Sequence, residues 1–244
     1  MKLALQHIMV SILLLTVAVG VNAQEAKVQN RPYTDLRPLH FGIVVGTNMQ
    51  DTEMSNVGQI TMPSGELSEI YGDQNSWSNG FNVGVLLEGR LSNHFAFRAA
   101  PQMYFGTRDY QFYNRLHPLE NIEVKRQSLR TVYVGANLDL IYAAQRFNNH
   151  RPYLMVGLAP MLNLTGNSGD YVKLKSSEVF VEAGIGCDLY LPFFKLRPEL
   201  KFMYGLTNCL DSKRDIKADN PILPYVKSID KARSKMVVIS FYFE

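Results

Sequence analysis

The chain has 244 residues, of which 46% are hydrophobic, 11% aromatic and 19% charged. The charged fraction lies below the roughly 25% of an average soluble domain, and a formal net charge of +3 gives no support to nucleic-acid binding. This length is enough for one large β domain or barrel.

The N-terminus has the organisation of a secretory signal peptide. Lys2 is followed by an uncharged apolar run, Ile8–Val19, and then by mostly small residues up to Ala23. We predict a signal peptide over residues 1–23, with cleavage between Ala23 and Gln24. An uncleaved membrane anchor is the alternative, but the run is short for a spanning helix, which needs about 20 apolar residues.

The mature chain divides into a short polar segment, 24–37, which we predict to be periplasmic, and a repeating strand pattern over 38–244. Apolar and polar residues alternate with a period of two in eight stretches, which is typical of strands with two unlike faces. Stretches of about 9–11 residues suit a tilted crossing of a bilayer. The predicted strands are Leu39–Thr47, Phe81–Leu91, Phe95–Phe105, Arg130–Leu140, Pro152–Leu162, Val179–Leu191, Phe194–Tyr204 and Met236–Phe243.

The connections between these strands alternate between short and long. The long ones are Met49–Gly80, Gly106–Leu129, Leu164–Glu178 and Thr207–Lys235. Short periplasmic turns and long external loops are the pattern of outer-membrane barrels, whereas a soluble sandwich has no reason to place every long loop at one end. A soluble lipocalin-like barrel would carry its apolar face inside. We therefore predict an all-β fold, an eight-stranded antiparallel transmembrane β-barrel in the outer membrane of a Gram-negative bacterium.

The polar face of the predicted strands carries acidic and basic residues in equal number. Eight strands enclose too little space for an open pore, and buried charges are tolerated only when they are paired and hydrogen-bonded. Glycines on the same face leave room for long side chains. We predict a structural charge network inside the barrel, made of Glu88, Arg90, Arg98, Asp139, Glu182, Asp188, Lys195, Arg197, Glu199 and Lys201.

Aromatic residues gather near the predicted strand ends, as in the interfacial girdles of membrane barrels. The last strand ends in Phe241, Tyr242 and Phe243, which resembles the C-terminal strand that the assembly machinery of outer-membrane barrels recognises. Glu244 departs from the usual final aromatic residue and weakens this argument.

Residues that carry chemistry are few and scattered. Cys187 and Cys209 are expected as unpaired thiols, although an oxidising compartment would also allow a disulfide. The stretch Gly166–Asp170 faintly resembles a serine-protease nucleophile loop, but a glycine-rich turn explains it better, and no Cys/His spacing predicts a metal site. We expect no catalytic residue, metal or cofactor, since the histidines of the mature chain do not converge with an acid and a serine at one rim. They are His40, His94, His117 and His150.

Loops on a rigid scaffold are better candidates for binding than the strands. Asp211–Lys235 is long and basic, and Leu116–Arg130 mixes charged with apolar residues. Basic groups at the outer rim could bind lipopolysaccharide phosphates, or they could form solvated loops. The segment 24–37 could contact other proteins in the periplasm.

Several stretches resemble the PorT family. They are "YTDLRPLHFGIVVGTN" (Tyr33–Asn48), "NLDLIYAAQRFNNHRPYLMVG" (Asn137–Gly157) and "VEAGIGCDLYLPFFKLRPELKFMYGLTN" (Val181–Asn208). The resemblance implies an outer-membrane barrel of the Bacteroidota that is required for the type IX secretion system, which exports proteases and adhesins. It supplies no catalytic residues.

Three functions remain open from the sequence. The first is a non-enzymatic barrel that serves type IX secretion through protein partners, the other components of that system. The second is a membrane hydrolase or acyl-chain enzyme with its site at the rim. The third is a structural tether or lipopolysaccharide binder. In each case outer-membrane lipid and lipopolysaccharide are expected to surround the barrel.

Overall fold

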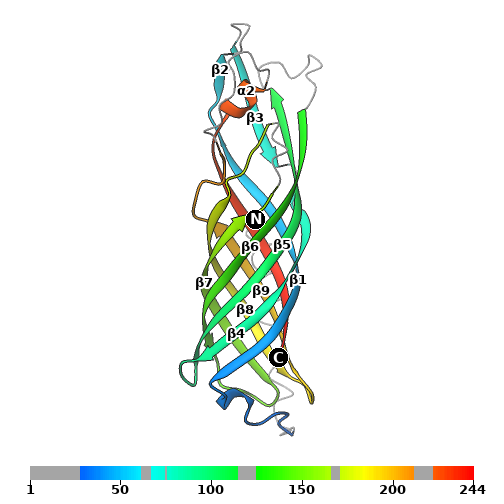
Figure 1. Cartoon of the computed structure of the whole chain (residues 1–244), viewed down its shortest axis with the longest axis vertical. Helices are drawn as coiled ribbons and strands as arrows, with labels where there is room; N and C mark the ends of the chain where they lie inside the picture. The colour runs from blue at the N-terminus through cyan, green and yellow to red at the C-terminus, as the bar shows by residue number, and fades with distance from the viewer. Residues whose placement is uncertain (1–27, 62–66, 75, 115–124, 166–170, 212–221) are drawn as a thin grey trace, which may run out of the picture.

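The computed structural model describes residues 28–61, 67–74, 76–114, 125–165, 171–211 and 222–244. The chain forms an elongated antiparallel barrel, with the short turns and the C-terminus at one end (Figure 1). Consecutive ring strands pair with each other, and β10 pairs back onto β1, so the ring closes. The ring strands are β1 (Leu39–Asn56), β4 (Ser78–Arg90), β5 (Phe95–Asn114), β6 (Lys125–Ala143), β7 (His150–Asn163), β8 (Ser177–Tyr190), β9 (Lys195–Gly205) and β10 (Ile229–Phe243). The prediction of an eight-stranded antiparallel barrel is confirmed.

Four of these strands run well past the predicted ends. β1, β5 and β6 have 18, 20 and 19 residues, and β10 begins at Ile229 rather than at Met236. The prediction of strands of 9–11 residues is wrong for them, because the apolar outward face stops while the backbone pairing continues. In β6 the outward residues beyond Val132 are Arg130, Ser128 and Arg126, so the signal that identified the strand is lost.

The predicted long loops therefore contain regular structure, and one of them, Thr207–Lys235, holds the helix α2 (Leu223–Lys227) and the start of β10. Met49–Gly80 holds the end of β1, the short strand β2 (Gln59–Thr61) and β3 (Leu67–Gln74), which pairs with the end of β5. Gly106–Leu129 holds the end of β5 and the start of β6, paired through Phe112 and Lys125. Together with the ends of β1 and β10, these elements form an extension of the barrel beyond the end that carries the long connections (Figure 1).

Among the described residues, helical structure is confined to two short pieces. The 3-10 helix η1 (Thr34–Leu36) precedes the barrel, and the one-turn helix α2 (Leu223–Lys227) precedes β10. The sequence pattern did not predict α2, because five residues are too few to show a helical period. In the part of the chain that the structure describes, no helix has the length and apolarity needed to span a membrane.

Candidate functional site

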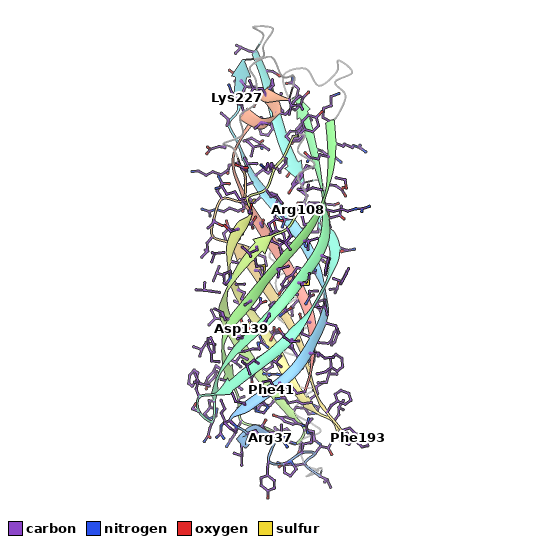
Figure 2. The ribbon with its side chains drawn as sticks, viewed as in Figure 1. Arg37, Phe41, Arg108, Asp139, Phe193 and Lys227 are labelled. Carbon is purple, nitrogen blue, oxygen red and sulfur yellow. The ribbon has the colours of Figure 1, made fainter. Side chains whose placement is uncertain are left out.

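An apolar belt surrounds the half of the barrel nearest the short turns. Outward residues of this belt include Phe41, Leu154 and Leu200, with exposed fractions of 68%, 57% and 46%. A strand of ten residues, with about 3.3 Å per residue and a tilt of about 40° from the barrel axis, rises about 25 Å along that axis. This is the height of the apolar band in outer-membrane barrels. Phe41 and Phe193 project outward near the short-turn end (Figure 2). The belt gives the bilayer a continuous apolar surface around the strands.

The short-turn end of the barrel is the lower end in Figure 1. At this end of the belt, the inward side chains form a charged cluster around Arg197, which we call the lower cluster. The Arg197 guanidinium lies 2.5 Å from Glu88, 2.6 Å from Asp188 and 2.8 Å from Glu244. Lys195 approaches Glu244 to 2.6 Å. All five side chains are buried or nearly so. The charges of β9 therefore point into the barrel and are matched by carboxylates from β4, β8 and the chain end.

A second charged layer lies above the first and is centred on Arg98. Its guanidinium bridges Asp139 at 2.8 Å and Glu199 at 2.7 Å, and Tyr153 and Tyr242 donate hydrogen bonds to Glu199. All of these side chains are buried. Gly157 makes room for this layer, since a Cβ there would meet the carboxylate of Asp139.

Next to this layer Lys201 pairs with Glu182 at 3.1 Å, and the Asn137 amide donates to the same carboxylate. Buried ion pairs of this kind contribute little net stability, but removing one partner leaves an uncompensated charge. The two charged layers fill the lumen at the level of the belt, and their acidic and basic side chains pair with each other.

Different side chains fill the lumen above the two charged layers, toward the extension. Tyr104, Met161 and Met203 fill the barrel above the charged layers. Higher still, Arg108 donates to Gln50, Thr52 and Ser234; Figure 2 shows how far it lies above Asp139 along the barrel.

The extension beyond the belt is closed by an apolar core. Strand residues meet residues of two connections there, and Leu174 and Leu210 are joined by a β-bridge. Burial raises the pKa of the Cys209 thiol in this core to about 12. The core consists of Ile70, Tyr110, Phe112, Leu129, Val172, Leu174, Cys209, Leu210, Ile229 and Ala232.

The opposite end of the lumen is covered by residues 28–37, which we call the N-terminal strap (Figure 1). Tyr190 donates a 2.6 Å hydrogen bond to Asp35, and Arg151 lies 3.6 Å from the same carboxylate. Asn30 donates two hydrogen bonds, from its backbone N–H to the Asn149 side-chain oxygen and from its side-chain amide to the Tyr190 carbonyl. The strap therefore lies across the short-turn end rather than hanging free of the barrel.

Of the ten residues predicted for the network, nine are brought together inside the barrel. Arg90 is not: it lies at the short-turn rim, where its guanidinium donates to Asn93 and to the carbonyls of Ser92 and Leu36. Its place near the end of β4 leaves it beyond the enclosed lumen. Alternation alone cannot show where the lumen ends, and so the prediction for Arg90 is wrong.

Two members of the lower cluster, Glu244 and His40, were not predicted from the sequence. Glu244 is buried among Arg197, Lys195 and His40, with His40 Nδ1 3.2 Å away. The terminal residue that seemed out of place for a membrane barrel is part of its charge network. Its alternation with Phe243 along the last strand was the available signal.

Other candidate residues are placed as follows. Cys187 and Cys209 are free thiols. Among the described residues no group of His, Cys, Asp and Glu is arranged to hold a metal ion. The predicted signal peptide with Ala23 and Gln24, His117, and the stretch Gly166–Asp170 lie outside the described residues.

Two solved outer-membrane proteins are similar to most of this chain at low sequence identity. None of the curated proteins matches the chain. Among solved structures, the outer membrane protein OprG from Pseudomonas aeruginosa is 10% identical, with 83% of this chain and 93% of that chain covered and a TM-score of 0.48. Neisserial surface protein A is 11% identical, with 84% and 98% covered and a TM-score of 0.44.

Residues 22–211 match the model of a family described as outer membrane protein beta-barrel domain. The match covers most of the chain and includes seven of the eight ring strands. It places the protein in the outer membrane of a Gram-negative bacterium. The chain therefore belongs to the family of outer membrane protein beta-barrel domains.

Proposed function

We propose that this chain is a non-enzymatic outer-membrane barrel that is required for type IX protein secretion and acts through protein partners. The observation that carries the proposal is the filled lumen. Charged layers around Arg197 and Arg98 occupy the lower half, and an apolar core occupies the extension. A barrel filled in this way offers no path for a solute, so its function rests on its outer surfaces and its two ends.

The short-turn end offers a surface of the kind that partners bind. Tyr33 and Leu36 of the N-terminal strap are 76% and 60% exposed, although Asp35 between them is anchored to the barrel. Both side chains expose apolar surface on an anchored segment, and burying that surface against a partner would be favourable. We propose that other components of the type IX system bind here, on the periplasmic side. The resemblance of Tyr33–Asn48 and Val181–Asn208 to the PorT family of the Bacteroidota supports this assignment.

A clean deletion strain tests the secretion role. Cargo proteases and adhesins should accumulate in the periplasm, and a plasmid copy of the gene should restore export. Normal export from the deletion strain would refute the role. When the plasmid copy carries a photo-crosslinking residue at Tyr33, it should capture a periplasmic partner, whereas a copy with that residue at Ser128 in the extracellular extension should not.

One observation favours lipopolysaccharide binding as a second function. Arg126 and Arg130 are exposed on the outward face of β6, directly above the apolar belt, at the level where lipopolysaccharide phosphates lie. If this is the main function, deletion will increase outer-membrane permeability and leave cargo export intact.

The enzyme alternative has less support among the described residues. His40 is committed to Glu244, and His94 Nδ1 lies 2.9 Å from the Ala143 carbonyl. Turnover of a lipid or peptide ester by the purified folded protein, abolished by alanine at a loop Ser or His, would establish that alternative.

A further inference from the structure

The lipid-facing wall of the lower barrel contains a hollow of about 700 Å³. One side of it is a row of bulky outward residues that pair across adjacent strands: Tyr142 with Leu154, Leu154 with Ile185, and Ile185 with Leu200. These side chains are exposed. The row forms a ridge across β6 to β9 on the outside of the barrel.

The floor of the hollow is the next outward row toward the short turns, and its residues are small. Ala144 donates its amide to the Pro152 carbonyl, Pro152 pairs with Cys187, and Pro198 follows on β9. The step from leucine, isoleucine and tyrosine in one row to alanine, proline and cysteine in the next creates the depression.

The backbone ladder is also interrupted at this floor. Pairing of β8 with β9 runs to Gly186–Glu199 and resumes only at Leu189–Leu196. Pro198 lies within the gap and has no N–H to donate. The hollow therefore lies where this part of the wall has the least side-chain cover and an incomplete ladder.

The position of the hollow decides what can fill it. It lies inside the apolar belt, so hydrocarbon rather than water meets it, and an apolar hollow left empty would lose dispersion contacts. Short turns of outer-membrane barrels face the periplasm, so the nearer leaflet is the phospholipid leaflet. One outward position beyond Pro152 on β7 is His150, which is exposed and can donate a hydrogen bond to a phosphate or ester oxygen.

We propose that this hollow binds one acyl chain of a phospholipid of the periplasmic leaflet, with the headgroup beside His150. The bound chain supplies the packing that Pro152, Cys187 and Pro198 do not. The volume falls within the range of pockets that hold small ligands, about 300–1,000 Å³. This proposal does not depend on the secretion role.

The test is native mass spectrometry of protein refolded in detergent with dipalmitoyl phosphatidylglycerol. Cys187→Phe fills the hollow, and Ala183→Phe is the matched control, because Ala183 is a small outward residue on the same face of β8 that does not line the hollow. We expect the wild type and Ala183→Phe to retain one lipid. Cys187→Phe should bind it about tenfold more weakly, and His150→Ala should weaken retention to a smaller extent.

Equal lipid retention by the wild type and both phenylalanine variants would overturn the proposal, and so would an equal loss in both variants. Folding of each variant is checked by its faster migration on an unheated gel. If Cys187→Phe does not fold, the pair Cys187→Leu and Ala183→Leu replaces the first pair, with the same two outcomes.

Discussion

The two halves of this barrel wall have opposite polarity. In the belt, β6 turns Leu138 and Leu140 outward and the buried Asp139 inward. In the extension, the same strand turns Arg130 outward and the buried Leu129 inward. β5 makes the same exchange.

The outer medium accounts for this reversal. A hydrocarbon environment requires an apolar outer face, and the polar residues of an alternating strand are then left inside, where they must pair. Above the belt the outer face meets water, and the inner face can form an ordinary apolar core. One continuous strand therefore faces hydrocarbon along the belt and water along the extension, without any change in its backbone pairing.

The charged layers should be the most sensitive part of the lower half. Arg98→Ala leaves Asp139 and Glu199 buried without their shared partner, and we expect a loss of about 3–5 kcal/mol in the free energy of unfolding. Urea titration in phospholipid vesicles measures it. Arg90→Ala at the exposed rim is the control and should cost less than about 1 kcal/mol. Similar losses for both variants would mean that the interior ion pairs are no more sensitive to substitution than the rim.

The apolar core of the extension should respond to a large-to-small substitution as the core of a soluble protein does. Phe112 is buried and lies against Tyr171 and Tyr225, at ring distances of 5.4 Å and 5.7 Å. Phe112→Ala should destabilise the extension by about 3–5 kcal/mol, seen as faster hydrogen exchange in β3 and the upper part of β5. Tyr113→Ala, at the neighbouring outward position, should have a much smaller effect. Equal exchange rates in the two variants would contradict the proposed core.

The reversal of polarity predicts that one substitution has two outcomes. Leu200→Arg places a charge on the outward face of the belt and should destabilise the inserted barrel by about 2–4 kcal/mol. Ser128→Arg places the same charge on the outward face of the extension and should change stability by no more than about 0.5 kcal/mol. If Leu200→Arg folded into vesicles as well as the wild type, the outward assignment of Leu200 would be wrong.

The smallest effect is expected at the N-terminal strap. Asp35 is partly exposed and contacts Tyr190, Arg151 and Arg146, so Asp35→Ala should cost only about 1 kcal/mol. Limited proteolysis should nevertheless show faster cleavage within the strap, while the barrel stays intact. Unchanged cleavage would show that Asp35 does not anchor it.

The sequence predicted the belt better than the rest of the molecule. Alternation of large apolar and polar residues identified all eight ring strands, because a lipid-facing strand must be apolar at every second residue. It failed above the belt, where Arg126 and Ser128 replace apolar residues on the outward face. There the pairing of β5 with β6 continues, but the alternation is reversed, with Leu129 inward and Arg130 outward. A search for an apolar outward face therefore stops at the end of the belt.

The sequence predicted which residues belong to the charge network, but not which of them form ion pairs with each other. A side chain on the inward face of a narrow barrel must meet other inward side chains, which is why Arg98 and Asp139 could be placed in one network. The strand register decides which partners meet, and the alternation of polar and apolar residues alone did not give that register. The role of Glu244 was missed for a related reason, since it depends on where the last strand ends relative to Lys195 and Arg197.

The proposed function rests on a filled lumen, and conductance across a planar bilayer tests this feature most directly. Purified wild-type barrel, shown to be folded by its gel migration, should produce no stable steps of ionic current, because paired charges and an apolar core occupy the described length of the interior. Reproducible, long-lived conductance steps from the folded wild-type protein would contradict the filled lumen and the function proposed from it.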